Sequence, residues 1–196
     1  MTDGLVRCWW AAGDAARPDP RMVAYHDDEW GVPSHDDVEL FERLALESFQ
    51  AGLSWSTILN KRESFRAAFA GFDPRVVATL DDADRERLMA DAGIVRNRAK
   101  IEATIGNAVA LLATATEFGS FDAYLASMVP GPPARLPASA SAGDIPATTP
   151  VSDTLSADLR GRGFKFVGST IVYAFLQSVG LVDDHLPVCF RYGVTR

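Results

Sequence analysis

Helical periodicity runs through almost the whole sequence and limits the fold more than any other feature. Apolar residues recur three or four positions apart, most clearly over residues 38–55, 97–115 and 168–179. That spacing places apolar side chains on one face of a helix. No segment alternates apolar and polar residues as a half-buried strand does. The sequence therefore predicts an all-α protein.

Local signals divide this helical pattern into segments. Ser34 to Asp37 resembles a capping box before the helix over 38–55, and Asp73 precedes a proline suited to a first helical position. Asp81 or Asp82 can open a helix that stops at Gly93. Further helices are expected over residues 97–115, 120–128, 152–161 and 168–179. Residues 130–150 are rich in Pro, Ala, Ser and Gly, and predict a long loop.

Composition narrows the function classes. A chain of 196 residues with 47% apolar and 23% charged residues is ordinary for one compact domain or two interlocked lobes. The net charge of −7 argues against nucleic-acid binding by the whole surface and leaves room for a local basic footprint. No apolar run approaches the ~20 residues of a membrane span, and no secretory signal is visible. We expect a cytoplasmic protein with no membrane partner.

Two cysteines and two of the three histidines have the chemistry of a metal site. His185 and Cys189 are spaced H-x3-C, which would place both side chains on one face of a helical turn, and Cys8 and His26 lie near the N-terminus. Two Cys and two His form a closed structural zinc set. One Zn²⁺ would then join the two ends of the chain. The alternative is a buried cysteine and surface histidines with no metal. His35 is expected to be solvated.

The segment GFKFVG, residues 163–168, lies between two helical patterns. Its glycines permit close approach to a partner, and the amides at the start of the next helix, near Ser169, favour an anion. Arg160, Arg162 and Lys165 lie close by in the sequence. The segment is a candidate phosphate grip, and the alternative is an ordinary corner between two helices.

A carboxylate stands in an apolar, aromatic-rich region. Glu47 precedes Trp55 by eight residues, so the two would share a face of one helix. A carboxylate among indoles is costly to bury without a partner, and a flat cationic base could be that partner. The alternative is an exposed Glu on an amphipathic helix. The aromatic residues of this region are Trp9, Trp10, Tyr25, Trp30 and Trp55.

Several longer strings carry a specific resemblance. They include RCWW, AYHDDEWGVP, LESFQAGLSWSTILNKRESFRAAF, DAGIVRNRAKI, RGFKFVGSTIVYAFLQSVGLVDDH and the final H-x3-C. Over nearly its whole length the chain resembles the DNA-3-methyladenine glycosylase I family. The resemblance implies a helix-hairpin-helix glycosylase fold that excises 3-methyladenine from alkylated double-stranded DNA by hydrolysing the N-glycosidic bond, leaving an abasic site. It also implies one structural Zn²⁺. Nothing in the sequence suggests more than a monomer.

The resemblance assigns roles residue by residue. It implies a single domain over 1–196, with a zinc lobe made from about 1–30 and 180–196. The zinc ligands fall on Cys8, His26, His185 and Cys189. The catalytic and base-binding residues fall on Glu47, Tyr25 and Trp55, with Trp10 and Trp30 nearby. The DNA-contacting hairpin residues fall on Gly163, Lys165, Val167 and Gly168.

Two departures from the family pattern affect the interpretation. The segment between Cys8 and His26 is longer than usual. Asp183 stands where the family has Asn, in the V-D-x-H context in which other helix-hairpin-helix glycosylases hold a catalytic aspartate. We interpret Asp183 as an acceptor that supports the zinc-ligand segment. The other interpretations of the whole chain are a damage-binding module without activity, a zinc-stabilised protein with no role on DNA, and a glycosylase of broader range, which the aromatic residues around Glu47 disfavour.

Overall fold

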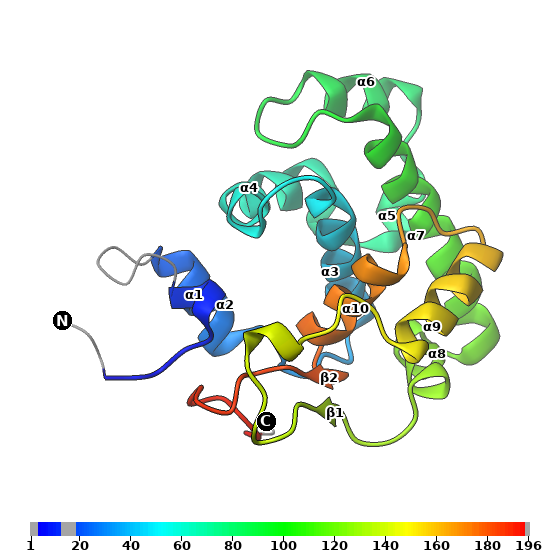
Figure 1. Ribbon diagram of the computed structural model, residues 1–196. Helices are drawn as coiled ribbons and strands as arrows, with labels where there is room; N and C mark the ends of the chain where they lie inside the picture. The colour runs from blue at the N-terminus through cyan, green and yellow to red at the C-terminus, as the bar shows by residue number, and fades with distance from the viewer. Residues whose placement is uncertain (1–3, 13–18, 195–196) are drawn as a thin grey trace. The chain divides into compact units, whose positions relative to one another are not determined.

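The computed structural model describes residues 4–12 and 19–194, and these residues form two compact units (Figure 1). The first unit contains the described residues of the ranges 4–34, 131–147 and 176–194, and the second contains residues 35–130 and 148–175. The first unit thus joins both terminal segments to part of the loop expected over 130–150. The organisation of 1–196 as one domain with a zinc lobe stays a prediction, and most of the long segment between Cys8 and His26 lies outside the described residues.

The first unit has little regular structure. Its helices are α1 (Trp9–Ala12), α2 (Pro20–Asp28) and the short 3₁₀ helix η2 (Ala142–Asp144). Strands β1 (Ala134–Arg135) and β2 (Val182–Asp183) pair in parallel, as Figure 1 shows. The expectation of no strand was therefore wrong in one small respect, because two-residue strands are too short to produce an alternating pattern.

The second unit is built from helices that follow one another through short connections. They are α3 (Asp37–Gln50), α4 (Trp55–Ala68), η1 (Ala70–Phe72), α5 (Pro74–Val77), α6 (Asp82–Ala90), α7 (Arg98–Phe118), α8 (Phe121–Met128) and α9 (Pro150–Gly161). Helix α10 (Ser169–Ser178) begins in this unit and ends in the first. Stacked and tilted phenylalanine rings of α3, α4 and η1 fill part of the core, namely Phe41, Phe49, Phe65, Phe69 and Phe72. The prediction of a helical protein is confirmed.

Most helix starts follow their sequence signals. The carboxylate of Asp73 accepts from the amide of Arg75, as expected. Asp81 precedes α6, also as expected, and forms a capping box with Asp84. The capping box proposed at Ser34 was wrong. Asp36 caps α3 instead, since its carboxylate accepts from two amides of the first turn.

The expected helix over 38–55 is interrupted. Helix α3 ends at Gln50, the backbone of Ala51 is not helical, and Gly52 has a φ of 81°. The hydroxyl of Ser54 then caps α4, which begins at Trp55. Glu47 and Trp55 therefore lie on different helices, so the prediction that they share one helical face was wrong. None of the helices in the described part of the chain is long and apolar enough to cross a membrane.

Candidate functional site

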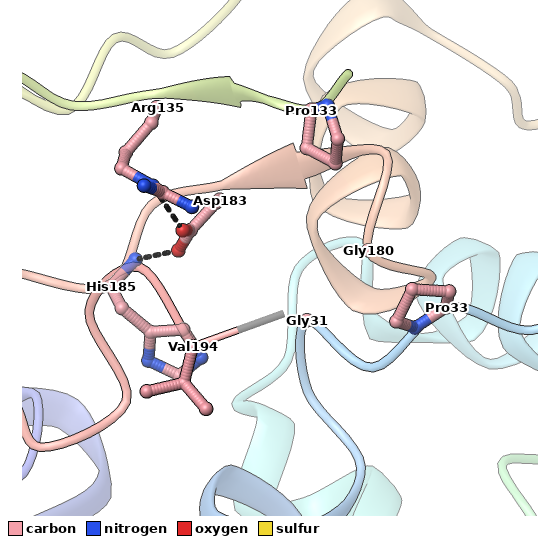
Figure 2. Close-up of a pocket in the computed structure, with 8 residues that line it drawn as sticks. All are labelled: Gly31, Pro33, Pro133, Arg135, Gly180, Asp183, His185 and Val194. Carbon is pink, nitrogen blue, oxygen red and sulfur yellow. Dashed lines mark hydrogen bonds and ion pairs between the residues drawn. The ribbon is translucent and has the colours of Figure 1, made fainter. Parts of the chain in front are cut away.

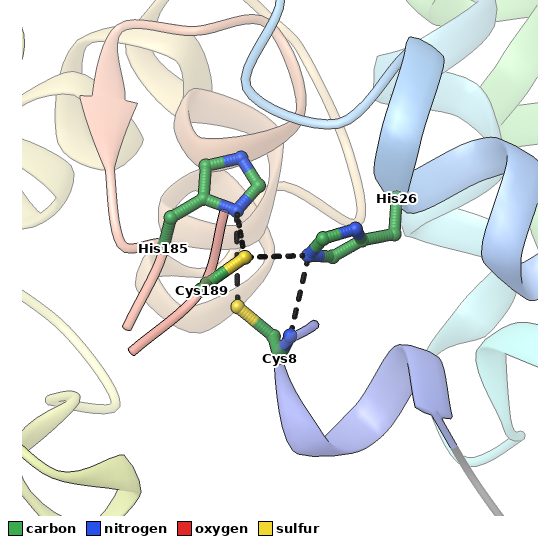
Figure 3. A group of neighbouring side chains, drawn as sticks. All are labelled: Cys8, His26, His185 and Cys189. Carbon is green, nitrogen blue, oxygen red and sulfur yellow. Dashed lines mark hydrogen bonds between the residues drawn. The ribbon is translucent and has the colours of Figure 1, made fainter. Parts of the chain in front are cut away.

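Four buried side chains of the first unit converge on one point. Figure 3 shows Cys8 at the start of α1, His26 on α2, and His185 and Cys189 from the C-terminal segment. Nε2 of His26 lies 3.4 Å from Sγ of Cys189, and Nδ1 of His185 lies 3.7 Å from Sγ of each cysteine. Metal bonds of ~2.0–2.3 Å in a tetrahedral site place ligand atoms ~3.3–3.8 Å apart. This Cys2His2 cluster therefore fits a tetrahedral divalent cation.

Hydrogen bonds select the nitrogen that each histidine offers. Nδ1 of His26 lies 2.8 Å from Oδ1 of Asp27, which leaves Nε2 to face the cysteines. Nε2 of His185 lies 3.3 Å from the carbonyl oxygen of Trp30, which leaves Nδ1 to face them. Such outer partners orient metal-binding imidazoles and fix their tautomers.

The two cysteines differ in their tendency to ionise: the hydrogen bond to Cys189 and burial raise the pKa of the Cys8 thiol, whereas the contacts of Cys189 favour its thiolate. A hydrogen bond from Cys8 is the largest cause that lowers the pKa of Cys189, and contacts with His185 and His26 add to it. Main-chain amides also donate to sulfur: Leu186 to Cys8 and Arg191 to Cys189, each at 3.4 Å. Thiolates are the form that binds metal, so these donors suit a cation at this point.

The C-terminal ligands reach the cluster without a helix. His185 lies in irregular backbone, and residues 186–189 form a turn in which the amide of Cys189 donates to the carbonyl of Leu186 at 2.7 Å. The prediction that H-x3-C lies on a helical turn was therefore wrong in its local structure, although both side chains do face the same point. The C-terminal segment can approach residues 31–33 closely because Gly31 and Gly180 have no side chain. A Cβ on Gly180, where φ is 73°, would lie 2.7 Å from the backbone nitrogen of Pro33.

Asp183 lies beside this segment (Figure 2). Its Oδ2 accepts from Nε of Arg135 at 2.7 Å, and its Oδ1 accepts from the main-chain amide of His185 at 3.3 Å. The ion pair joins β2 to β1, and the second bond supports a candidate metal ligand. These contacts agree with an acceptor role for Asp183. Two glycines, two prolines and Val194 enclose the rest of the small cavity drawn in Figure 2.

Aromatic rings surround the histidines of the cluster. Trp30 packs edge-on against His185 at a ring distance of 4.6 Å, and Trp10 packs against Trp30 at 5.0 Å. Tyr25 lies next to Trp10 at 6.2 Å and is buried. Three of the expected pocket aromatics are thus neighbours within the first unit.

Glu47 lies in the second unit and faces an open pocket of about 250 Å³. Residues of α3, of the following turn and of α10 line it, namely Gln50, Ala51, Gly52, Leu53, Thr170, Ile171 and Ala174. Glu47 is 6% exposed, and burial raises its pKa to about 8 against the opposing charge of Arg43. The alternative of a solvent-exposed Glu47 is therefore excluded. Trp55, half-buried, begins α4 in the same unit.

The hairpin loop, residues 163–168, is held by three side chains that the sequence analysis did not single out. The amide of Asn107 pairs with both main-chain groups of Lys165, at 2.8 and 2.9 Å. Ser48 donates to the carbonyl of Phe166, and Ser156 to that of Val167. The loop thus keeps one backbone shape, including a φ of 54° at Phe166. The one sequence signal for the support of this loop is Asn107, a polar residue on the apolar face of its helix.

The predicted loop residues differ in exposure. Gly163 and Lys165 are exposed, Gly168 is half-buried, and Val167 is buried. Of the neighbouring cations, Arg162 is engaged by Glu117 and Asp158, and Arg160 binds Ser156. Both arginines therefore bind side chains of the protein itself, whereas Lys165 is exposed.

Comparison with known proteins agrees with these features. The sequence pattern of the family described as methyladenine glycosylase matches residues 15–192. The chain is 48% identical over 188 residues to DNA-3-methyladenine glycosylase 1 of Escherichia coli, covering 96% of this chain and 97% of the relative. It is 44% identical to DNA-3-methyladenine glycosylase of Haemophilus influenzae, covering 94% and 96%.

A solved structure agrees in fold. The 3-methyladenine DNA glycosylase I of Staphylococcus aureus superposes with a TM-score of 0.87 at 40% identity, covering 93% of this chain and 96% of that one. Both the sequence pattern and the relatives span nearly the entire chain. This protein therefore belongs to the methyladenine glycosylase family, the DNA-3-methyladenine glycosylases I.

Proposed function

We propose that this protein excises 3-methyladenine from alkylated double-stranded DNA by hydrolysing the N-glycosidic bond, acting as a monomer and leaving an abasic site. Glu47 is the observation that carries the proposal. It is a buried carboxylate with no hydrogen bond to any described residue, and it faces a pocket just below the ~300 Å³ lower limit typical of small-molecule sites. Burial keeps Glu47 protonated at neutral pH in the free protein, and a cationic base in the pocket would favour its ionised form.

The enzyme needs mainly to extract the methylated nucleotide from the duplex and to bind its base. Methylation at N3 gives adenine a positive charge in DNA and weakens its glycosidic bond. The nucleotide must leave the base stack, which costs a few kcal/mol, and enter a fitted pocket. Glu47 then accepts hydrogen bonds from the edge of the base. Water attacks C1′ of the sugar as the base departs, and contacts that strengthen as the bond breaks accelerate the step.

Aromatic residues complete the proposed recognition. Tyr25 and Trp55 stack on the base or bound its ring, with Trp10 and Trp30 contributing nearby. Support comes from the packing of Tyr25, Trp10 and Trp30 in the first unit and from the position of Trp55 at the start of α4. An aromatic surface attracts a flat cation more strongly than a neutral base, which favours the methylated form over adenine.

The hairpin loop 163–168 is the proposed contact with the DNA backbone. Its exposed glycine and Lys165, together with main-chain amides ahead of α10, would hold phosphates close to the lesion. The rigid support from Asn107 and Ser156 favours this role. Contacts of this kind position the duplex and carry no sequence information, which suits an enzyme that must find damage in any sequence.

Zn²⁺ is the proposed ion of the Cys2His2 cluster, held by Cys8, His26, His185 and Cys189. Thiolate and imidazole donors in a closed set of four are typical of structural zinc. When bound, the ion would supply folding free energy to the first unit, because the four ligands come together only in the folded chain. The residues of the cluster join α1 and α2 to the C-terminal segment.

Release of bases from methylated duplex DNA tests the proposal. Wild-type protein and Glu47→Gln are incubated with the DNA and the freed bases are separated by chromatography. We expect 3-methyladenine from the wild type and a loss of about 10- to 100-fold in Glu47→Gln, since a hydrogen bond to a charged group contributes about 1.5–3 kcal/mol. Equal release by both would remove Glu47 from the proposal. Binding of methylated DNA without release would identify a damage-binding module instead.

A further inference from the structure

Lys100 is a buried cation with no role in the activity proposed above. Its side chain is 6% exposed, and burial lowers the pKa of its ammonium. Lysine is rarely buried unless its charge is paired. Here the ammonium donates to two main-chain carbonyl oxygens, those of Phe49 at 2.9 Å and Ala51 at 2.7 Å. Because burying an ammonium is energetically unfavourable, we expect Lys100 to have a specific structural role.

The two carbonyls belong to the end of α3. The carbonyl between them, that of Gln50, accepts from the amide of Leu53 at 2.6 Å. Three consecutive carbonyls at the end of the helix therefore have donors, although the helix itself provides none. A cation is also favoured at a helix C-terminus, because the helix dipole is negative there. Lys100, from α7, thus ties the last turn of α3 and the residue beyond it to a second helix.

This helix end is also the rim of the Glu47 pocket. Residues 51–53, here termed the rim turn, line the pocket together with Glu47 and Gln50. All three residues of the rim turn are exposed, and Gly52 has a φ of 81°. Little packing therefore restrains the turn, and the hydrogen bond from Lys100 to the carbonyl of Ala51 ties it to α7.

We infer that Lys100 is a positioning residue for the base-binding pocket: it fixes the end of α3, and with it Glu47 and the rim turn, without touching the base. The inference rests on the proposed role of Glu47. It predicts that loss of the ammonium changes the shape of the pocket more than the stability of the protein. An apolar side chain of similar length can fill the space of the lysine stem but cannot hold the carbonyls.

The chain provides a matched control. Lys61 on α4 also donates to two neighbouring carbonyls, those of Ala92 at 2.9 Å and Gly93 at 3.2 Å. These carbonyls lie in the connection between α6 and α7, which contributes no residue to the Glu47 pocket. Lys61→Met and Lys100→Met therefore each remove two hydrogen bonds from an ammonium to main-chain carbonyls, but in two different turns.

Three measurements on metal-loaded wild type and both variants test the inference. They are thermal unfolding, hydrogen exchange of the peptide covering residues 47–55, and titration with free 3-methyladenine followed by tryptophan fluorescence. We expect both variants to lose stability to a similar extent. Only Lys100→Met should exchange faster over 47–55 and bind 3-methyladenine at least 10-fold more weakly, with KM for methylated DNA raised more than kcat is lowered. Lys61→Met should bind the base within 2-fold of wild type.

Other outcomes overturn the inference or separate it from the proposed function. Wild-type affinity for the base in Lys100→Met overturns it, as does an equal loss of affinity in Lys61→Met. If Lys100→Met does not fold, Lys100→Gln replaces it, with the same expected direction and the same condition for rejection. If the wild type neither binds the base nor releases it from DNA, the proposed function is wrong. The hydrogen-exchange data then test Lys100 by themselves. Faster exchange over residues 47–55 in Lys100→Met would show that Lys100 holds the rim turn, and unchanged exchange would show that it does not.

Discussion

Oδ1 of Asp27 lies 2.8 Å from Nδ1 of His26, and the same carboxylate forms a bidentate ion pair with Arg7. Burial opposes ionisation of Asp27, but the hydrogen bonds from Arg7 and His26 prevail and lower its pKa. Its carboxylate is therefore charged at neutral pH and accepts the Nδ1 proton of His26. This contact decides which nitrogen of His26 faces the two cysteines.

Asp27→Ala is expected to weaken metal binding. Loss of an outer partner of a metal-binding histidine typically costs about 10- to 100-fold in affinity. Competition with a chromogenic chelator measures the change. Asp19→Ala is the matched control, since Asp19 caps the same helix and does not contact His26. A metal affinity in Asp27→Ala equal to that of the control would show that the carboxylate does not orient the ligand.

Metal removal is expected to destabilise the protein. The four ligands come from segments far apart in the sequence, so without an ion they lose the contact that joins them. Chelation should lower Tm by more than about 5 °C, given that 1 kcal/mol corresponds to roughly 2–4 °C at this size. Calorimetry with and without chelator, together with elemental analysis, provides the measurement. An unchanged Tm after complete metal loss would contradict a structural ion.

Asp183→Asn is expected to keep base release within about 3-fold of wild type. The carboxylate bonds to Arg135 and to an amide, and its ion pair with the 40% exposed Arg135 side chain is of the class that contributes ~0–1 kcal/mol. An amide oxygen can still accept from the amide of His185. Single-turnover base release by Asp183→Asn is the test. A loss above about 100-fold in the folded, metal-loaded variant would instead give Asp183 a catalytic role.

Glu47 is expected to make stability fall as pH rises. Its pKa is about 8 in the folded protein and 4.5 in the unfolded chain, so the folded state holds one more proton between these values. Stability decreases with pH wherever the folded state binds more protons. Glu47→Gln should therefore gain stability relative to wild type from pH 5 to pH 8, measured by urea denaturation. A constant difference between the two proteins across this range would contradict a raised pKa.

Lys165→Ala is expected to weaken DNA binding at low salt and to reduce its salt dependence. One lost phosphate contact should lower the slope of log K against log [salt] by about 1. Fluorescence anisotropy with unmodified duplex DNA measures both quantities. Arg162→Ala serves for comparison, because Arg162 is engaged by Glu117 and Asp158 and should leave the slope unchanged. Identical slopes for wild type and Lys165→Ala would remove Lys165 from the interface.

The sequence by itself determined most of the helices and the residues that meet in the Cys2His2 cluster. Helix periodicity and caps such as Asp73 and Asp81 depend on neighbouring residues, so they can be read locally. With only two cysteines and three histidines in the chain, few sets of soft donors are possible. One local error, the continuous helix over 38–55, arose because the apolar pattern continues across the turn at Gly52 and Ser54.

Tertiary structure decided everything that depends on contacts between distant residues. The partners of Asp27 and Asp183, the support of the hairpin loop by Asn107, and the burial of Glu47 follow from packing that no local pattern records. Lys100 illustrates the difference. In the sequence nothing indicates a partner for this cation, but in the fold its ammonium is buried against the carbonyls of Phe49 and Ala51. A charged side chain can pair with any polar group that lies close to it, so its partner is known only once the chain has folded.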